Sequence, residues 1–191
     1  ILGPAPTLGE LTPSFGPGSN VGCSKNTNAR SKLAARATVS ANAAAYVSAV
    51  AGSHPWWPLE KTEVKHGKLT FVPKTAAIDR SIVVEPILNT YLQKGCGDWI
   101  RRRLKRAGCD LDSQETNRDL ARFASITGVL ATVDLSSASD TLAKAVVEEV
   151  LPYDWWSLLC SFRTATVTYR GQPIHLQKFS SMGNGFTFEL G

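Results

Sequence analysis

The chain has 191 residues, of which 43% are hydrophobic and 19% are charged, and its formal net charge is +5. This composition is typical of a globular domain with a buried core and excludes intrinsic disorder and collagen-like repeats. No apolar run reaches the roughly 18 residues that a membrane-spanning helix needs. The chain begins with Ile1 and shows no signal-peptide pattern, and both of its ends look cut, so we expect a fragment of a longer protein.

The charge is distributed unevenly along the chain. Residues 1–59 carry a net charge of +3, residues 60–106 carry +6, and residues 107–191 carry −4. The basic middle segment suits contact with a phosphate backbone, although a solvated helical surface explains the same charges about equally well. The four cysteines form no Cys-x-x-Cys pair and the three histidines lack zinc-ligand spacing, so we expect free thiols.

The N-terminal half predicts a loop, two helices and a pair of strands. Residues 15–20 are rich in glycine and proline and predict a loop, whereas the alanine-rich residues 38–51 predict a helix. Two short runs with strand-like composition, 68–72 and 81–84, predict strands that are joined by a link. A long helix is expected over 87–107, with arginines and lysines at the negative end of its dipole.

The C-terminal half predicts a buried strand between two helices, followed by shorter elements. A capping-box pattern at 112–115 predicts a helix that ends near Gly128. Residues 129–133 are apolar and predict a buried strand that places Asp134 at its end, before a helix over 137–151. The remaining expected elements are a helix over 153–162, a hairpin over 166–178, and a loop over 180–185 that leads into a final helix.

Two aspartates have a spacing that suits a metal ion. Asp134 follows the apolar stretch and Asp140 lies in the first turn of the next helix, so both carboxylates can face one crevice. Hard cations such as Mg²⁺ prefer oxygen ligands of this kind. Taken alone, the two aspartates are explained at least as well by helix capping and by the helix dipole.

Two further segments suit a nucleotide. The loop 180–185 has glycines on both sides of Asn184, which allows a ligand to approach the backbone and the amide. Lys74 and Arg80 lie in the link between two strands and can both reach a triphosphate. Each segment alone has a simpler explanation, namely a capped loop and two solvated loop cations.

Together and in this order, the segments resemble the RNA-directed RNA polymerase, or replicase β subunit, of small single-stranded RNA bacteriophages (the leviviruses). Residues 72–86, 131–140 and 179–190 are similar to that family's motifs F, A and B. The Gly-Pro-Gly sequence at 16–18 is also similar to its fingers region. The resemblance extends through most of the chain, which is much shorter than a full replicase.

The resemblance implies an α+β fold, namely part of a right-hand polymerase with residues 1–128 as fingers and residues 129–191 as the first part of the palm. It implies template-directed nucleotidyl transfer with two Mg²⁺ ions, or Mn²⁺, in the cytoplasm of an infected bacterium. The implied partners are template RNA and nucleoside triphosphates, with the host's translation elongation factors Tu and Ts and a ribosomal protein as further subunits. No contact with a membrane is implied.

The resemblance also implies a role for individual residues. Asp134 would be the catalytic residue and a metal ligand, with help from the Leu135 carbonyl, and either Ser139 or Asp140 would lie near the ribose. Asn184 would sense the 2′-hydroxyl group that distinguishes RNA from DNA precursors. The other implied nucleotide-binding residues are Lys74, Arg80, Ser181 and Gly183, and the RNA-binding residues are Arg101, Arg102, Arg103, Lys105 and Arg106.

The chain departs from the family because it lacks the Gly-Asp-Asp turn that supplies the other metal carboxylates. We therefore expect that this chain alone does not polymerise RNA. One alternative is a non-enzymatic RNA-binding module, in which residues 60–106 bind phosphates and the rings of Trp56, Trp57 and Trp99 stack on bases. Another is a phosphoryl-transfer domain that uses a strand-end aspartate as its nucleophile.

Overall fold

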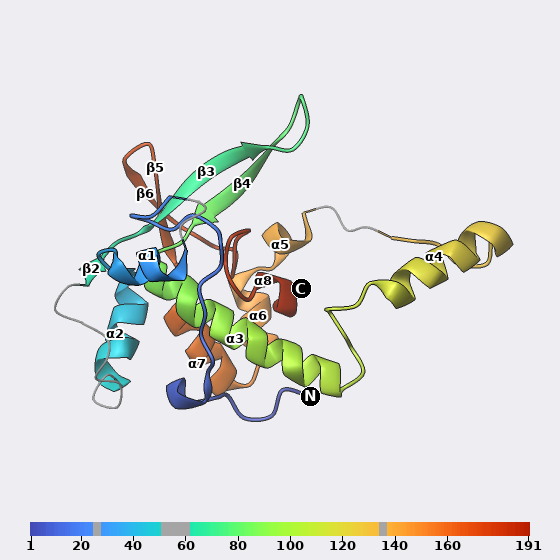
Figure 1. Ribbon diagram of the computed structural model, residues 1–191, viewed down its shortest axis with the longest axis horizontal. Coiled ribbons are helices and arrows are strands. Elements are labelled where there is room, and N and C mark those ends of the chain that lie inside the picture. Colours follow the sequence, from blue (N-terminus) through green and yellow to red (C-terminus); the bar gives the residue numbers. More distant parts are fainter. Residues whose placement is uncertain (25–27, 51–61, 134–136) are drawn as a thin grey trace.

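The computed structural model describes residues 1–24, 28–50, 62–133 and 137–191, which form a mixed α+β fold (Figure 1). The central element is the 20-residue helix α3 (Ile87–Arg106), which packs against α7 (Tyr153–Phe162) and α8 (Thr187–Leu190). Apolar side chains of these helices and of neighbouring segments form the main core, and its most buried members include Cys96, Ile100, Trp155, Leu159, Phe162, Phe179 and Phe186. None of the described helices is long and apolar enough to cross a membrane.

A four-stranded sheet, in the order β4-β3-β5-β6, lies beside one end of α3 (Figure 1). Strands β3 (Gly67–Pro73) and β4 (Asp79–Val84) lie where two linked strands are expected, and they pair as an antiparallel hairpin. Strands β5 (Thr166–Tyr169) and β6 (Gln172–His175) form the second hairpin. The turn between β5 and β6 uses Arg170 and Gly171, whose φ angles of 49° and 81° are the positive values that a tight hairpin favours.

Three helices lie where the sequence predicts them. Helix α3 follows a proline and ends at Arg106, with Ala107 as its C-cap, and α7 spans the expected ten residues. Helix α4 (Glu115–Thr127) ends at Gly128, which adopts the left-handed conformation that favours glycine. The expected capping box is absent from α4, because its first turn begins at Gln114 without a side-chain cap. The shorter helical elements are η1 (Leu8–Glu10) and α1 (Ala29–Ala34).

The prediction of one helix over 38–51 is wrong at its beginning. Helix α2 covers only Ala41–Val50, while β1 (Thr38–Val39) pairs in parallel with β2 (Glu63–Val64). The Thr38 hydroxyl donates to the Val21 carbonyl at 2.9 Å and accepts from the Ile87 amide at 3.0 Å. These tertiary bonds stabilise an extended backbone and outweigh the local helix propensity. The predicted end of this helix lies outside the described residues.

The prediction of a buried strand over 129–133 is also wrong. No described strand pairs with this segment, and Val129 and Val133 are 67% and 82% exposed. An apolar run needs a neighbouring strand for its backbone hydrogen bonds, and the described residues supply none here. The helix expected over 137–151 is broken into α5 (Ala138–Thr141) and α6 (Lys144–Val150). The break occurs where the Phe179 amide donates to the Leu142 carbonyl at 2.7 Å.

Candidate functional site

Residues from all three motif segments line one cleft of about 700 Å³. We call it the nucleotide cleft, after the ligand that the sequence predicts for its residues. Lys74 and Arg80 come from the β3–β4 hairpin, Ser139 and Asp140 from α5, and Asn184 from the loop before α8. The tertiary structure therefore brings together five residues that are far apart in sequence. The rest of the lining includes Ile78, Asp79, Ser81, Met182, Gly183, Thr187 and Phe188.

The loop over 180–185 is held between β4 and α3 by hydrogen bonds. The Val83 amide of β4 donates to the Met182 carbonyl at 2.9 Å. On the other side, the Gly185 amide donates to Oε1 of Gln93 in α3 at 3.1 Å. The loop therefore has a definite position relative to the hairpin that carries the two cations.

Glycines allow the close approach of this loop to its neighbours. Gly183 has a φ of 110°, and a Cβ atom there would lie 2.3 Å from the Val83 carbonyl oxygen. A Cβ atom on Gly97 of α3 would lie 2.4 Å from the Gly185 carbonyl oxygen. Real Cβ atoms do not approach an oxygen so closely, so any larger residue at these positions must displace the backbone.

A buried polar network below the loop was not found by sequence reasoning. Gln93 Nε2 donates to a carboxylate oxygen of Glu85 at 3.1 Å and to the Phe162 carbonyl at 2.9 Å. The Thr164 hydroxyl also donates to Glu85, whose pKa is raised to about 7 because the carboxyl group is fully buried. Gln93 thus connects the buried carboxyl group to the loop. The available signal was a pair of amides four residues apart, Asn89 and Gln93, on the buried side of a predicted helix.

Asn184 uses its side chain to begin the helix that follows it. Its Oδ1 atom accepts a hydrogen bond from the Phe186 amide at 3.0 Å. No partner for Nδ2 lies among the described residues, so this amide group remains a donor for a ligand. Ser181, by contrast, is only 2% exposed, and its carbonyl accepts a bond from the Thr187 hydroxyl at 3.0 Å. Ser181 therefore contributes to the shape of the loop rather than to the cleft surface.

Asp140 is paired with a lysine that sequence reasoning did not select. Lys178 Nζ lies 2.5 Å from Asp140 Oδ1, and the lysine side chain is mostly buried. Ser139 is half-buried and lines the same cleft. No motif pattern marks Lys178, because its partner is 38 residues away in sequence. Asp134 and Leu135, the expected metal ligands, lie outside the described residues.

The described residues do not form a metal site by themselves. No group of three histidine, cysteine, aspartate or glutamate side chains that could hold a metal ion occurs among the residues that the structure describes. Asp140 is a suitable oxygen ligand, but its carboxylate is already neutralised by Lys178. A magnesium site in this cleft would therefore need further oxygen ligands.

The cations at the end of α3 are largely engaged within the chain. Arg101 contacts Glu189 and Asp112, each at 2.6 Å, and hydrogen bonds to these carboxylates raise its pKa. The guanidinium groups of Arg102 and Arg103 each lie 5.4 Å from the centre of the Trp99 ring. The Trp99 ring thus contacts two cations of its own helix. Lys105 pairs with Asp110 at 2.9 Å, Arg106 is exposed, and Trp56 and Trp57 lie outside the described residues.

The nucleotide cleft combines two exposed cations, two aspartates of which Asp140 is paired with Lys178, and an amide donor, which suits an anionic, polar ligand. Residues 11–191 match the family described as RNA replicase, beta-chain. Because this match covers almost the whole chain, the chain belongs to the RNA replicase β-chain family.

Several relatives carry the name of a polymerase. The chain is 44% identical to the RNA-directed RNA polymerase beta chain of Enterobacteria phage GA over 170 residues, which cover 83% of this chain and 32% of that protein. It is 50% identical to the polymerase of Escherichia phage MS2 over 119 residues, or 62% of this chain and 22% of the relative. It is 43% identical to the RNA-directed RNA polymerase subunit beta of Escherichia virus Qbeta over 124 residues, which cover 64% of this chain and 21% of that protein. The matched region therefore spans a third or less of each relative.

Proposed function

We propose that this chain is part of an RNA-directed RNA polymerase and that its nucleotide cleft binds the incoming nucleoside triphosphate. The observation that carries this proposal is the convergence of Lys74, Arg80 and Asn184, from segments about a hundred residues apart, on a single cleft. Membership of the replicase family and the names of the relatives support the same reaction, template-directed nucleotidyl transfer during replication of a viral RNA.

The two cations of the hairpin would bind the triphosphate. Lys74 and Arg80 are both exposed, and neither forms an ion pair among the described residues. An arginine can contact two phosphate oxygens at once, whereas a lysine provides a mobile point charge. Together they offset the negative charge that develops on the phosphates during transfer.

The polar groups across the cleft would bind the sugar. Asn184 Nδ2 is a donor without a partner in the described part of the chain and suits the 2′-hydroxyl oxygen of a ribonucleotide. Ser139 or Asp140 would lie near the ribose hydroxyls. The Lys178 ammonium group holds the Asp140 carboxylate in one place, and this reduces the entropy lost when a sugar binds.

A divalent metal would complete the site in the whole polymerase. We propose that the Asp134 carboxylate and the Leu135 carbonyl hold Mg²⁺ or Mn²⁺, since both are hard oxygen ligands. When bound there, such ions would supply Lewis-acid activation of the attacking 3′-hydroxyl group and charge neutralisation at the leaving pyrophosphate. The part of the chain that the structure describes contributes the binding and orientation of the nucleotide.

The larger assignments follow from the same proposal. Residues 1–128 would belong to the fingers and residues 129–191 to the palm. The exposed cations near the end of α3, foremost Arg106, would contact template RNA. The whole polymerase would act in an infected bacterium, together with the host's elongation factors Tu and Ts and a ribosomal protein.

Nucleotide binding by the purified chain tests the proposal directly. A fluorescent GTP derivative is titrated into the chain and into the variants Lys74→Gln and Arg80→Gln. We expect each variant to bind about tenfold more weakly, which corresponds to the loss of one charge-assisted contact. Arg118→Gln on α4, which removes the same charge outside the cleft, is the matched control. Equal affinities for all four proteins would contradict the proposal.

The sugar contact has its own test. Asn184→Ala should bind GTP more weakly and dGTP as before, so that the preference for the ribonucleotide disappears. A variant that loses affinity for both nucleotides equally would assign Asn184 to loop structure alone. We also expect no incorporation of labelled nucleotide by the chain alone. Incorporation above background would overturn the expectation that further metal ligands are needed.

A further inference from the structure

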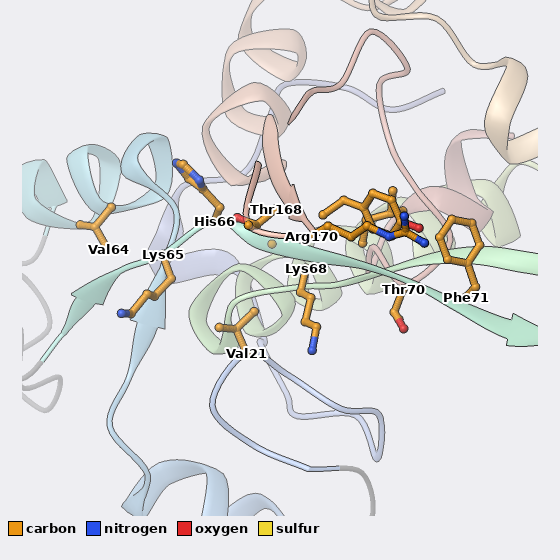
Figure 2. A pocket seen from close by; sticks show the side chains of 13 residues that line it. Val21, Val64, Lys65, His66, Lys68, Thr70, Phe71, Thr168 and Arg170 are labelled. Carbon is orange, nitrogen blue, oxygen red and sulfur yellow. The ribbon is translucent and has the colours of Figure 1, made fainter. Parts of the chain in front are cut away.

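A second cleft lies where strands β3 and β5 separate (Figure 2). The two strands pair only at Gly67 with Val167 and at Lys68 with Thr168, and beyond these pairs they diverge (Figure 1). The opening has a volume of about 760 Å³. We call it the fork cleft, and its lining consists of Val21, residues 64–71 and residues 168–171. It has no lining residue in common with the nucleotide cleft.

The charge of the fork cleft has one sign. Lys65, Lys68 and Arg170 line it, and no aspartate or glutamate does. Lys68 and Arg170 are exposed and form no ion pair among the described residues, whereas Lys65 lies 3.3 Å from Glu63 outside the lining. Uncompensated cations around a concave surface concentrate a positive potential and attract anions.

Two aromatic rings lie among these cations. Phe71 is 46% exposed, and its ring centre lies 5.6 Å from that of Tyr169 in an edge-to-face arrangement. The Arg170 guanidinium lies 5.2 Å from the centre of the Tyr169 ring. Figure 2 labels Phe71 and Arg170 among the side chains that line the cleft, and Tyr169 contacts both of them. Aromatic faces between cations are the combination that binds single-stranded nucleic acid, because bases stack on the rings while phosphates contact the charges.

The backbone around the fork cleft is fixed at two places, by close packing at Gly67 and by the tight turn at Arg170. A Cβ atom on Gly67 would lie 2.8 Å from the Thr164 side chain and 2.9 Å from that of Val83, so β3 is closely packed at the base of the fork. The positive φ of Arg170 belongs to the tight turn that directs the chain back along β6. The backbone that carries these side chains therefore loses little entropy when a ligand binds.

We propose that the fork cleft binds a short segment of single-stranded RNA, with bases on Phe71 and Tyr169 and phosphates at Lys65, Lys68 and Arg170. This site is additional to the nucleotide cleft. Lys68 lies in β3 and Lys74 directly follows the strand, six residues later, which corresponds to about 20 Å of extended chain. A duplex is a poor ligand, because its bases are already stacked and paired.

The test measures binding of a fluorescein-labelled oligouridylate of about ten nucleotides, a length within the range of known single-strand sites. The double variant Lys68→Gln/Arg170→Asn removes two cations, and asparagine tolerates the positive φ at residue 170. We expect about tenfold weaker binding. The binding constant falls as the salt concentration rises, so a plot of log K against log salt concentration has a negative slope. We expect the magnitude of this slope to decrease by about 1.4, which is about 0.7 for each of the two lost phosphate contacts. The matched control is Arg118→Gln/Arg122→Gln on α4, which removes the same charge.

The aromatic contribution is measured separately. Tyr169→Leu keeps an apolar side chain but removes the ring, and it should weaken binding about tenfold. Tyr169→Phe keeps the ring and should bind nearly as the unaltered chain does. Circular dichroism of each variant establishes that the fold is retained. If both Tyr169 variants bind equally well, the stacking part of the proposal is wrong.

Three results would overturn the proposal. The unaltered chain could fail to bind the oligonucleotide at low salt. The α4 control could lose as much affinity as the fork variant, which would assign binding to net charge. Alternatively, only Lys74→Gln/Arg80→Gln could lose binding, which would place the RNA in the nucleotide cleft. Titration of the GTP derivative should be unaffected by the fork variants, so failure of the fork proposal is distinguishable from failure of the proposed function.

Discussion

Two regions next to the nucleotide cleft in sequence differ in how closely they pack against the rest of the chain. The loop over 180–185 lies between β4 and α3, with close-approach glycines and a buried polar network around it. Helix α4 and the segment 129–133, which we call the arm, project away from the rest of the chain (Figure 1). No residue of α4 is buried, and its exposed apolar side chains include Leu120, Phe123 and Ile126.

The difference separates two kinds of site residue. Lys74, Arg80 and Asn184 are positioned by contacts within the described chain, so their arrangement is a property of this fold. Ser139 and Asp140 closely follow the arm in sequence. Lys178 holds the Asp140 carboxylate, but the nearest backbone bond to a distant segment is the one from the Phe179 amide to the Leu142 carbonyl. Substitutions in the packed region should therefore have large effects, and equivalent substitutions in the arm should have small ones.

Among the comparisons between the two regions, the largest loss of stability is expected for Gly183→Ala. Alanine at a φ of 110° is strained, and its Cβ atom would lie 2.3 Å from the Val83 carbonyl oxygen, so we expect a loss of about 4 kcal/mol of unfolding free energy. In the arm, Gly128→Ala also has a positive φ but no atom within 4 Å, and it should lose about 1 kcal/mol. Urea denaturation followed by circular dichroism measures both. Equal losses would mean that the loop can move away from β4.

The next largest effect depends on pH and concerns Glu85. Burial raises the pKa of this carboxyl group from 4.5 to about 7, so the folded state favours the neutral form. Its contribution to stability is complete below pH 4.5 and is lost as the pH rises towards about 7. The unfolding free energy should fall by about 3 kcal/mol across this window, and Glu85→Gln should abolish the fall. The control variant Glu115→Gln in the arm should keep this fall in unfolding free energy with rising pH. If the fall persists in Glu85→Gln, Glu85 is not its source.

A smaller effect is expected at the contact between α3 and α8. Arg101→Ala leaves the Glu189 carboxylate, whose side chain is only 7% exposed, without its partner and should cost about 2 kcal/mol. Lys105→Ala removes an exposed pair with Asp110 and should not change stability measurably. Thermal denaturation compares the two variants. If Arg101→Ala is as stable as Lys105→Ala, Arg101 is free to serve another role, such as binding RNA.

The smallest effect is expected on the exposed side of α4. Ile126 is 76% exposed, so Ile126→Ser should change the unfolding free energy by no more than about 0.5 kcal/mol. Ile100→Ser, the same change at a side chain that is 1% exposed, should destabilise the chain strongly. Urea denaturation of both variants is the measurement. Destabilisation of the chain by Ile126→Ser would show that α4 packs against another surface in solution.

Much of the fold was predictable because it depends on local signals. Both hairpins, α3 and α7 lie where strand composition, prolines and glycines predict them, and all four cysteines are free thiols. Three predictions were wrong where tertiary contacts decide the backbone, and one of them is the helix expected over 137–151, which is broken where the Phe179 amide bonds to the Leu142 carbonyl. Thr38 is extended because its hydroxyl bonds two distant backbone groups, and residues 129–133 form no strand because the described chain offers no strand to pair with.

The candidate site was predictable in part. The motif order selected Lys74, Arg80, Ser139, Asp140 and Asn184, and the structure places all five around one cleft, while their roles remain proposals. Gln93, Glu85 and Lys178 were missed, because each acts through a partner that is distant in sequence or hidden in the core. Arg101 was assigned to RNA from its place in a basic run, but two carboxylates already bind it.

By itself, the sequence determined the family and the order of the chemical groups, because motifs of a few residues carry that information in their side chains. Only the tertiary structure decided which of these groups meet. It packed the glycine loop against Val83 and Gln93, paired Asp140 with Lys178, and left β3 and β5 to diverge around Phe71 and Tyr169. These outcomes depend on close packing and hydrogen bonding between segments up to about a hundred residues apart, which no local pattern encodes.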